Sequence, residues 1–336
     1  MINTKLHRRL NLINSPAPHL NAASQHLSAA SQHLSAASQH LSAASQHLSA
    51  ASQHLSAASG MATVGEFLYV VADDENHLGV FPRTGTGAGH LHRIFDGDLP
   101  HDPAARKAAK RDMEALVHLP RSTTHPHGAL LALGSGSKPQ RCTGVVLALD
   151  AVGAISGAPT QLDLSLFYAK LADEIGHINI EGAVVIADEL RLLNRGNKKN
   201  GINACVALSL SNFLLSSASR YPKIGRLQPI ELGKIDGVQL CFSDAAALPN
   251  GGMLFTAAAE NTDDSYLDGP CAGNVIGILD KHMRLRFVEE LDNKQKVEGV
   301  VANLTSTKIQ LQMVTDADDA TQAAQWLTAE FPLPWA

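Results

Sequence analysis

A degenerate unit recurs five times between Ser59 and the C-terminus, and it constrains the fold more than any other feature of the chain. Each unit consists of a small or acidic residue followed by Gly or Ala, an apolar run, a short turn, a second apolar run, and a polar corner rich in Gly or Asp. The units open at Ser59-Gly60, Glu114-Ala115, Glu181-Gly182, Asp244-Ala245 and Glu298-Gly299. Their spacing is longer than a compact four-stranded propeller blade of about 40–50 residues and is compatible with blades that carry loop insertions.

A third apolar run completes several of the units, as at residues 144–149, 204–210 and 275–279. Short apolar runs bounded by turn residues predict β-strands. One small sheet cannot bury both of its faces, so sheets repeated in this way must stack radially and close into a ring. The sequence therefore predicts an all-β fold, a β-propeller of five or six blades. Helical patterns are confined to short insertions at residues 102–116 and 164–175.

A second, near-identical repeat occupies residues 19–58, where Ser-Ala-Ala-Ser-Gln-His-Leu is copied in tandem. A coiled coil needs apolar residues at two positions of every heptad, whereas each copy here offers a single Leu. Ala favours a helix, but Ser and His do not. We expect this low-complexity heptad segment to be helical or disordered and to carry no chemistry.

Residues 1–18 are expected to contain a strand that closes the ring. The chain after Glu298 is too short for a whole unit, and residues 5–13 contain enough Leu and Ile to supply the missing outer strand. The heptad segment would then be an insertion in a connection, which costs little because loop-closure entropy grows slowly with length. The propeller domain is assigned to residues 59–336. The alternative is that residues 1–58 are an unrelated tail and that translation effectively begins near Met61.

Composition excludes two broad classes of function. The formal net charge is −5, and no basic stripe with interleaved aromatic residues appears, so we expect no nucleic-acid partner. No window approaches about 18 consecutive apolar residues, so we expect no membrane association and a cytoplasmic location. The four cysteines are far apart and form no CxxC pair, which predicts isolated buried thiols rather than a zinc site. The sequence leaves the oligomeric state open.

The repeated unit also predicts where the chemistry lies. In an antiparallel hairpin the start of one strand lies beside the end of the next, so the opening residue and the polar corner of each unit should emerge on one face. If the first run of each unit is the innermost strand, four carboxylates ring the mouth of the central channel: Glu114, Glu181, Asp244 and Glu298. A second circle of polar residues surrounds them: Asp73, Asp74, Ser135, Ser137, Asn194, Arg195, Asn197, Glu260, Asp316 and Asp318.

Acidic groups crowded at one axis repel each other unless a cation or a basic side chain compensates them. Arg195 and Lys198 supply part of that compensation. A hard divalent ion, Ca²⁺ first, is predicted for the remainder, with Glu114, Glu181, Asp244 and Glu298 as its ligands. Glu181 and Asp244 are the predicted catalytic residues, and the second circle is the predicted ligand-binding set. The alternative is that each acid only accepts backbone N–H bonds and fixes a turn.

The sequence resembles an uncharacterised bacterial β-propeller family that is similar in blade pattern to phytase-like and esterase-like propeller proteins. The resemblance extends from about Leu55 to the C-terminus and rests on residues 59–60, 69–74, 132–137, 179–182, 193–197, 255–264, 296–299 and 314–319. By analogy, it implies Ca²⁺-assisted hydrolysis of phosphate or other esters on the channel face.

Three functional hypotheses follow. The first is a divalent-metal-dependent hydrolase of phosphate or other esters of a small molecule, acting at the channel face. The second is a non-catalytic propeller that binds a small molecule or a protein partner on the same face. The third is an enzyme that acts on a sugar or a lactone, with Asp244 or Glu181 as the base.

Overall fold

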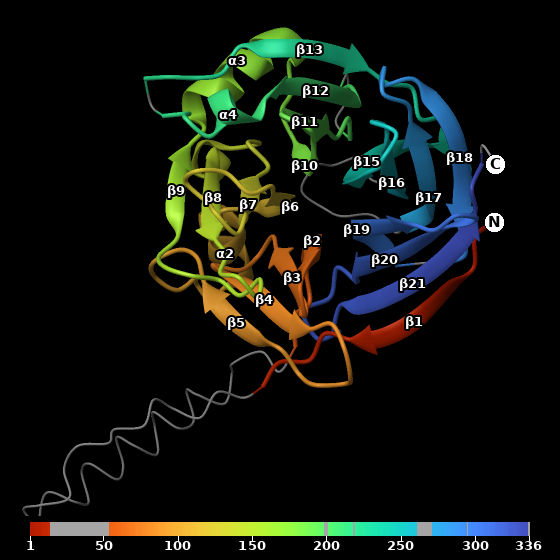
Figure 1. The fold of residues 1–336 in the computed structure, drawn as a ribbon, viewed down its shortest axis with the longest axis horizontal. Helices are drawn as coiled ribbons and strands as arrows, with labels where there is room; N and C mark the ends of the chain where they lie inside the picture. Colours follow the sequence, from red (N-terminus) through yellow and green to blue (C-terminus); the bar gives the residue numbers. More distant parts are fainter. Residues whose placement is uncertain (14–53, 198–200, 218, 261–270, 294, 335–336) are drawn as a thin grey trace, which may run out of the picture.

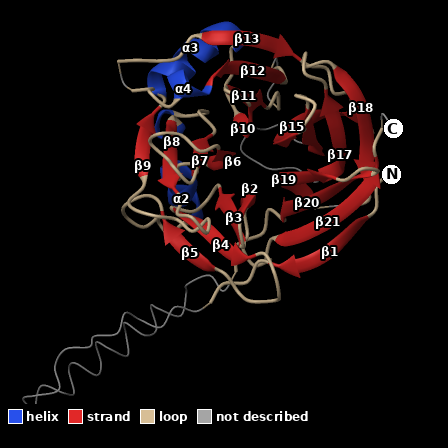
Figure 2. Cartoon of the chain, in the orientation of Figure 1, coloured by secondary structure: helices blue, strands red, loops and turns tan. Residues whose placement is uncertain are grey.

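Five antiparallel sheets are arranged radially around one axis in the computed structural model, which describes residues 1–13, 54–197, 201–217, 219–260, 271–293 and 295–334 (Figure 1). The predicted all-β propeller is confirmed, and it has five blades. Strands dominate the cartoon, and the α-helices of the described residues lie around the second and third sheets (Figure 2). Most of the predicted heptad segment falls in residues 14–53, outside the described residues.

The first four blades follow one another along the chain. Blade 1 contains β2 (Ala58–Val64), β3 (Phe67–Ala72), β4 (His77–Pro82) and β5 (His90–Arg93). Blade 2 contains β6 (Met113–Leu119), β7 (Ala129–Gly134), β8 (Thr143–Ala148) and β9 (Thr160–Asp163). Blade 3 contains β10 (Ile180–Ile186), β11 (Glu189–Asn194), β12 (Ala204–Ser209) and β13 (Ile224–Pro229). Blade 4 contains β14 (Lys234–Ile235), β15 (Val238–Ala247), β16 (Met253–Glu260), β17 (Cys271–Leu279) and β18 (Leu285–Leu291).

The fifth blade joins the two ends of the described chain. Its strands are β19 (Lys296–Leu304), β20 (Lys308–Asp316), β21 (Gln325–Pro332) and, as the outer strand, β1 (Thr4–Arg9). β1 runs antiparallel to β21 along the rim (Figure 1). The guanidinium of Arg8 lies 4.8 Å from the centre of the Trp326 ring, and Leu10 is fully buried. Residues 1–13 therefore pack as part of the propeller.

The helices are short insertions, as expected, but one ends earlier than predicted. α3 (Ser165–Ile175) occupies the predicted position, and α4 (Leu210–Phe213) is a single turn. α2 (Pro103–Ala109) begins where the Asp102 carboxylate accepts the Ala105 N–H at 2.8 Å. The expectation of helix as far as residue 116 is wrong, because the chain leaves α2 at Lys110 and the inner strand β6 begins at Met113. No helix among the described residues is long and apolar enough to cross a membrane.

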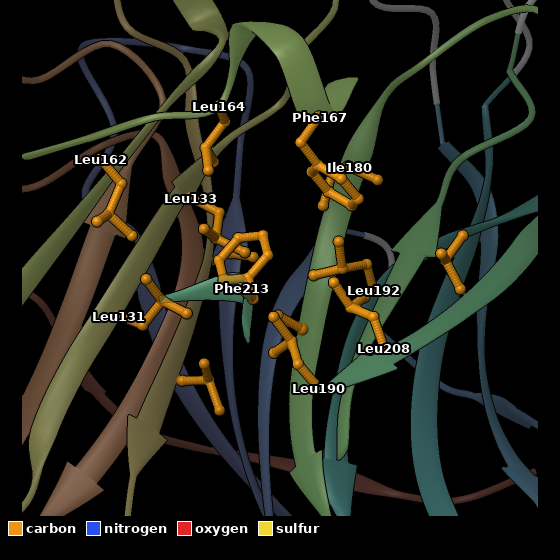
Figure 3. Packing of buried hydrophobic residues seen from close by; sticks show 14 of the residues in the cluster. Leu131, Leu133, Leu162, Leu164, Phe167, Ile180, Leu190, Leu192, Leu208 and Phe213 are labelled. Atoms are coloured by element: carbon orange, nitrogen blue, oxygen red, sulfur yellow. The ribbon is translucent and has the colours of Figure 1, made fainter. Parts of the chain in front are cut away.

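Adjacent blades are held together by apolar side chains between their facing sheets. Between blades 2 and 3, Leu131 and Leu133 of β7 face Leu190 and Leu192 of β11, with Phe213 of α4 between them (Figure 3). Burying a large aliphatic or aromatic side chain contributes about 1.5–3 kcal/mol to the free energy of folding. The radial stack thus supplies the apolar burial that a single blade lacks.

The five inner strands β2, β6, β10, β15 and β19 share a device that aims side chains at the axis. Each pairs with its neighbour through a register shift at the opening residue of its unit, for example between Ile180 and Gly182 and between Val297 and Gly299. A β-bulge bends a strand and redirects a side chain. The following small residue lets neighbouring inner strands approach, since a Cβ on Gly182 would lie 2.8 Å from Asp244 Cα.

Candidate functional site

A pocket of about 150 Å³ lies at the end of the channel where the inner strands begin. Every residue that lines it is polar and most are charged, with acids and bases intermixed. The inner strands supply these side chains in pairs two residues apart, as in Asp112 and Glu114, Asn179 and Glu181, and Lys296 and Glu298. Alternate residues of a strand share a face, and the bulge lets both members of a pair reach the pocket.

One wall of the pocket is formed by the Lys110 cluster, which we define as Asp73, Lys110, Asp112, Glu114 and Arg141. The Lys110 ammonium forms an ion pair with Asp73 and lies 2.9 Å from Asp112 Oδ1. Arg141 Nη1 donates to Asp112 Oδ2 at 2.6 Å. The side chain of Glu114 makes no hydrogen bond or ion pair with any described residue.

Electrostatics in the Lys110 cluster favour extra positive charge. Burial, then Glu181 and Asp112, raise the pKa of Glu114 well above its usual value. Burial alone would lower the pKa of Lys110, but Asp73 and Asp112 outweigh it and raise this pKa. Lys110 is therefore a charged ammonium. A cation beside Glu114 would oppose the upward shift in the pKa of that carboxyl.

The same pocket is also lined by the Arg195 cluster, which we define as Glu181, Arg195, Glu260, Lys296 and Glu298. Arg195 forms ion pairs with Glu260, with Glu181 at 3.2 Å and with Glu298 at 3.5 Å. Lys296 Nζ lies 2.9 Å from Glu260 Oε1 and 3.0 Å from Glu298 Oε1. Two cations thus face three carboxylates, all of them buried or nearly so.

The three carboxylates of the Arg195 cluster differ in how their oxygens are used. Glu181 accepts from Asn179 Nδ2 on one oxygen and from Arg195 on the other. Glu260 pairs with Arg195 through Oε2 and with Lys296 through Oε1. Glu298 pairs only through Oε1, and its Oε2 has no hydrogen-bond partner among the described residues.

Burial raises the pKa of several pocket acids. It is the largest cause for Glu181, whose pKa rises to about 8 despite Arg195. It is also the largest cause for Asp316, where Asp318 and Asp73 add to it and the pKa again reaches about 8. The pKa of Glu260, by contrast, is lowered, because Arg195 and Lys296 outweigh its burial.

The described residues contain one group of side chains arranged to hold a metal ion, namely Asp73, Asp112 and Glu114. Ligand oxygens of these three carboxylates lie within 4.8 Å of one another. Carboxylate oxygens are the donors that Ca²⁺ and Mg²⁺ prefer, so the donor set fits a hard divalent cation. The Lys110 ammonium already pairs with two of the three carboxylates and would compete with such an ion.

The sequence model of one protein family matches residues 54–331 of the chain. That family is DUF6929, described as a family of unknown function. The chain belongs to it. No curated protein matches the chain. The match covers all five blades except β1 and carries no assigned activity.

Solved structures with similar folds are distant in sequence. The luciferin-regenerating enzyme is 14% identical with a TM-score of 0.40, covering 82% of this chain and 78% of that one. The Penicillium chrysogenum α-L-arabinanase bound to arabinobiose is 6% identical with a TM-score of 0.40, covering 84% and 95%. The Myceliophteria thermophila Swd1 propeller domain is 11% identical with a TM-score of 0.35, covering 78% and 67%. Such distant similarities carry no argument about function.

Three of the four predicted ring carboxylates line the pocket: Glu114, Glu181 and Glu298. Asp244 does not, although it lies at the equivalent position. It is 1% exposed, and its Oδ2 accepts the Val300 N–H at 2.9 Å. Burial raises the pKa of Asp244 well above its usual value, although backbone hydrogen bonds from Val300 and Ala183 act in the opposite direction. Asp244 therefore ties the inner strands of blades 3, 4 and 5 together.

The second circle of predicted ligand-binding residues is also divided into residues that line the pocket and residues that do not. Its members that line the pocket are Asp73, Ser137, Arg195, Asn197, Glu260, Asp316 and Asp318. Asp74, Ser135 and Asn194 lie outside the lining. Ser135 donates to Asp112 at 2.5 Å, Asn194 bonds three backbone groups, and Asp74 lies 3.8 Å from Arg106. Lys198 and residues 261–270 fall outside the described residues.

Sequence reasoning missed the basic side chains that organise the pocket. Lys110, Arg141 and Lys296 each pair with a pocket carboxylate, and Asp112 belongs to the metal-ligand group. The sequence contains a signal for Asp112 and Lys296, because each precedes a ring carboxylate by two positions. Alternation along a strand places such residues on the same face as the carboxylate.

Proposed function

We propose that this protein is a hydrolase of phosphate or other esters of a small polar molecule, assisted by a divalent cation at the channel mouth. The single observation that carries the proposal is the group of three carboxylates formed by Asp73, Asp112 and Glu114 in a pocket lined only by polar residues. Ca²⁺ is the first candidate because all the donors are carboxylates.

The proposed ligand set differs from the ring expected from the repeat. Glu181 and Glu298 are paired with Arg195, and Asp244 does not line the pocket. Glu114 supports the proposal most strongly, because its carboxylate has no partner among the described residues and its pKa is raised by burial and neighbouring acids. A cation beside it would relieve that repulsion.

The chain's own residues supply the other requirements of the reaction. A bound divalent cation lowers the pKa of water and offsets negative charge on an ester oxygen. Lys107, Lys138 and Arg141 line the same pocket and supply positive charge toward an anionic part of a substrate. The Arg195 cluster fixes three further carboxylates in the same pocket, so the reacting groups would face a preorganised set of charges.

The test uses protein stripped with EDTA and supplied in turn with Ca²⁺, Mg²⁺, Mn²⁺ or Zn²⁺. Hydrolysis of p-nitrophenyl phosphate and p-nitrophenyl acetate is measured for the wild type and for Glu114→Gln. Glu66→Gln is the matched control, because it removes an exposed carboxylate at the β2–β3 turn, away from the pocket. We expect cation-dependent turnover that Glu114→Gln loses and Glu66→Gln keeps. A wild type that is inactive with all four cations contradicts the proposal.

A second candidate is a non-catalytic propeller that binds a small charged molecule in the same pocket. It is favoured by the internal pairing of both clusters, since Lys110 already compensates two carboxylates without a metal. Binding without turnover is its signature. An enzyme for sugars or lactones with Glu181 or Asp244 as the base has less support, because both oxygens of Glu181 accept hydrogen bonds and Asp244 lies outside the pocket.

A further inference from the structure

Glu298 is the one carboxylate of the Arg195 cluster with an oxygen that makes neither a hydrogen bond nor an ion pair with a described residue. Its side chain lines the pocket and is 4% exposed. Lys296 and Arg195 both pair with Oε1, at 3.0 and 3.5 Å. Oε2 is buried and has no hydrogen-bond partner among the described residues. A buried polar atom without a partner costs about 1–3 kcal/mol, so such an atom in a pocket calls for an explanation.

The pairing of Oε1 has a geometric consequence. Two cations lie against Oε1, so Oε2 is the oxygen of this carboxylate that is left to accept a hydrogen bond. Both oxygens of Glu181 accept hydrogen bonds. Glu260 Oε1 lacks a hydrogen bond among the described residues, but it lies 2.9 Å from the Lys296 ammonium and is already ion-paired. Glu114 also lacks a partner, but it belongs to the proposed cation group.

We infer that Glu298 Oε2 is the general base of the pocket and accepts the proton of the attacking water. This inference rests on the proposed function and adds a catalytic residue to it. Positioned side chains that transfer a proton contribute about 10²- to 10⁴-fold to a rate. Burial raises the pKa of Glu298 despite Lys296 and Arg195, which makes its carboxylate a stronger base than a solvent-exposed one.

The step balances in atoms and charge. Water gives one proton to Glu298 Oε2 while its oxygen forms a bond to the carbonyl carbon or phosphorus of the ester. The bond from that centre to the leaving oxygen breaks, and the departing alkoxide takes a proton from solvent. Glu298 then releases its proton to solvent, so the net reaction is ester plus water giving acid plus alcohol.

The test compares two isosteric variants in the same charge cluster. Glu298→Gln and Glu260→Gln each remove one negative charge beside Lys296 and Arg195. Glu260 Oε1 and Glu298 Oε2 both lack a hydrogen bond to a described residue, but Glu260 Oε1 forms an ion pair with Lys296 and Glu298 Oε2 forms none. Turnover of the two p-nitrophenyl esters is measured with the activating cation. The cation-induced rise in melting temperature is recorded in parallel. A third variant, Glu298→Ala, is assayed with and without added formate, which can replace the missing carboxylate.

We expect Glu298→Gln to lose at least about 100-fold in kcat while keeping its cation-induced stabilisation, and Glu260→Gln to lose clearly less. Formate should restore part of the activity of Glu298→Ala. Glu298→Gln activity within tenfold of the wild type overturns the inference. So does a loss that formate does not restore, because that marks a structural role, and so does loss of the cation response. A wild type inert toward both esters removes the proposed function, and the base role with it.

Discussion

The ammonium of Lys110 lies 2.9 Å from Asp112 Oδ1 and also pairs with Asp73, between two carboxylates of the only group of described residues arranged for a metal. An intrinsic cation therefore shares the position that a divalent ion would need. Arg141 holds the other oxygen of Asp112 at 2.6 Å, so Asp112 stays in place whether or not Lys110 moves. The affinity of the pocket for a metal depends on this competition.

Replacing Lys110 with Met should strengthen cation binding. The change removes the competing ammonium, so the carboxylates of Asp73, Asp112 and Glu114 lose the positive charge of Lys110. Removing one partner of a buried ion pair typically costs about 3–5 kcal/mol, so Lys110→Met should melt below the wild type in EDTA. Adding Ca²⁺ should recover much of that loss. A melting-temperature titration with Ca²⁺ checks this, and a variant response no steeper than the wild-type response would refute the competition.

Gly182, which follows the ring residue Glu181, should be indispensable for blade packing. A Cβ at residue 182 would lie 2.8 Å from Asp244 Cα, which is backbone and cannot yield. Gly182→Ala should therefore destabilise the fold by about 1–3 kcal/mol, the usual cost of overpacking. Gly273→Ala is the matched control, because its new Cβ meets only the flexible end of Ile235. Equal denaturation midpoints for the two variants would contradict the argument.

Residues 1–13 should contribute to the stability of the whole propeller. Leu10 is fully buried, whereas Leu6 on the adjoining strand β1 is 55% exposed. Leu10→Ala should cost about 2–5 kcal/mol, and Leu6→Ala should stay within about 0.5 kcal/mol of the wild type. Urea denaturation measures both. An unrelated N-terminal tail would leave both variants unchanged, and that result would rule out closure by β1.

The stability of the metal-free protein should fall as the pH rises. Burial, together with Asp318 and Asp73, raises the pKa of Asp316 to about 8 from an ordinary value of 3.8. The folded state thus holds a proton that the unfolded state releases, and the stability present below about pH 4 is lost as pH rises through 8. Asp316→Asn mimics the protonated acid, so it should melt above the wild type at pH 9 and match it near pH 4. If the melting temperatures of Asp316→Asn and the wild type, measured in EDTA, changed with pH in parallel, the prediction would be contradicted.

The ring of carboxylates could be predicted because it follows from local sequence. Glu114, Glu181 and Glu298 each open a repeated unit before a small residue, and an antiparallel hairpin brings such openings to one face. Asp244 obeys the same pattern, yet its carboxylate bonds the Val300 N–H of the next inner strand. The direction taken by a side chain at a bulge depends on its neighbours in space, which one sequence does not specify.

The pairing within the pocket could not be predicted for the same reason. Lys110 follows α2, outside the repeated unit, and reaches Asp73 of the preceding blade only after the sheets have stacked. Arg141 comes from the short turn Pro139–Arg141 and reaches Asp112 across blade 2. Long-range ion pairs of this kind arise from tertiary structure and have no local sequence signature.

Calorimetric titration of Ca²⁺ into EDTA-stripped protein tests the central claim most directly, with Glu114→Gln and Glu66→Gln titrated alongside. Ca²⁺ should bind the wild type and Glu66→Gln with a stoichiometry of one and bind Glu114→Gln more weakly. At about 100 times the dissociation constant it should stabilise the fold by roughly 2.7 kcal/mol. No heat of binding in the wild type, or equal binding by Glu114→Gln, would contradict a cation site formed by Asp73, Asp112 and Glu114.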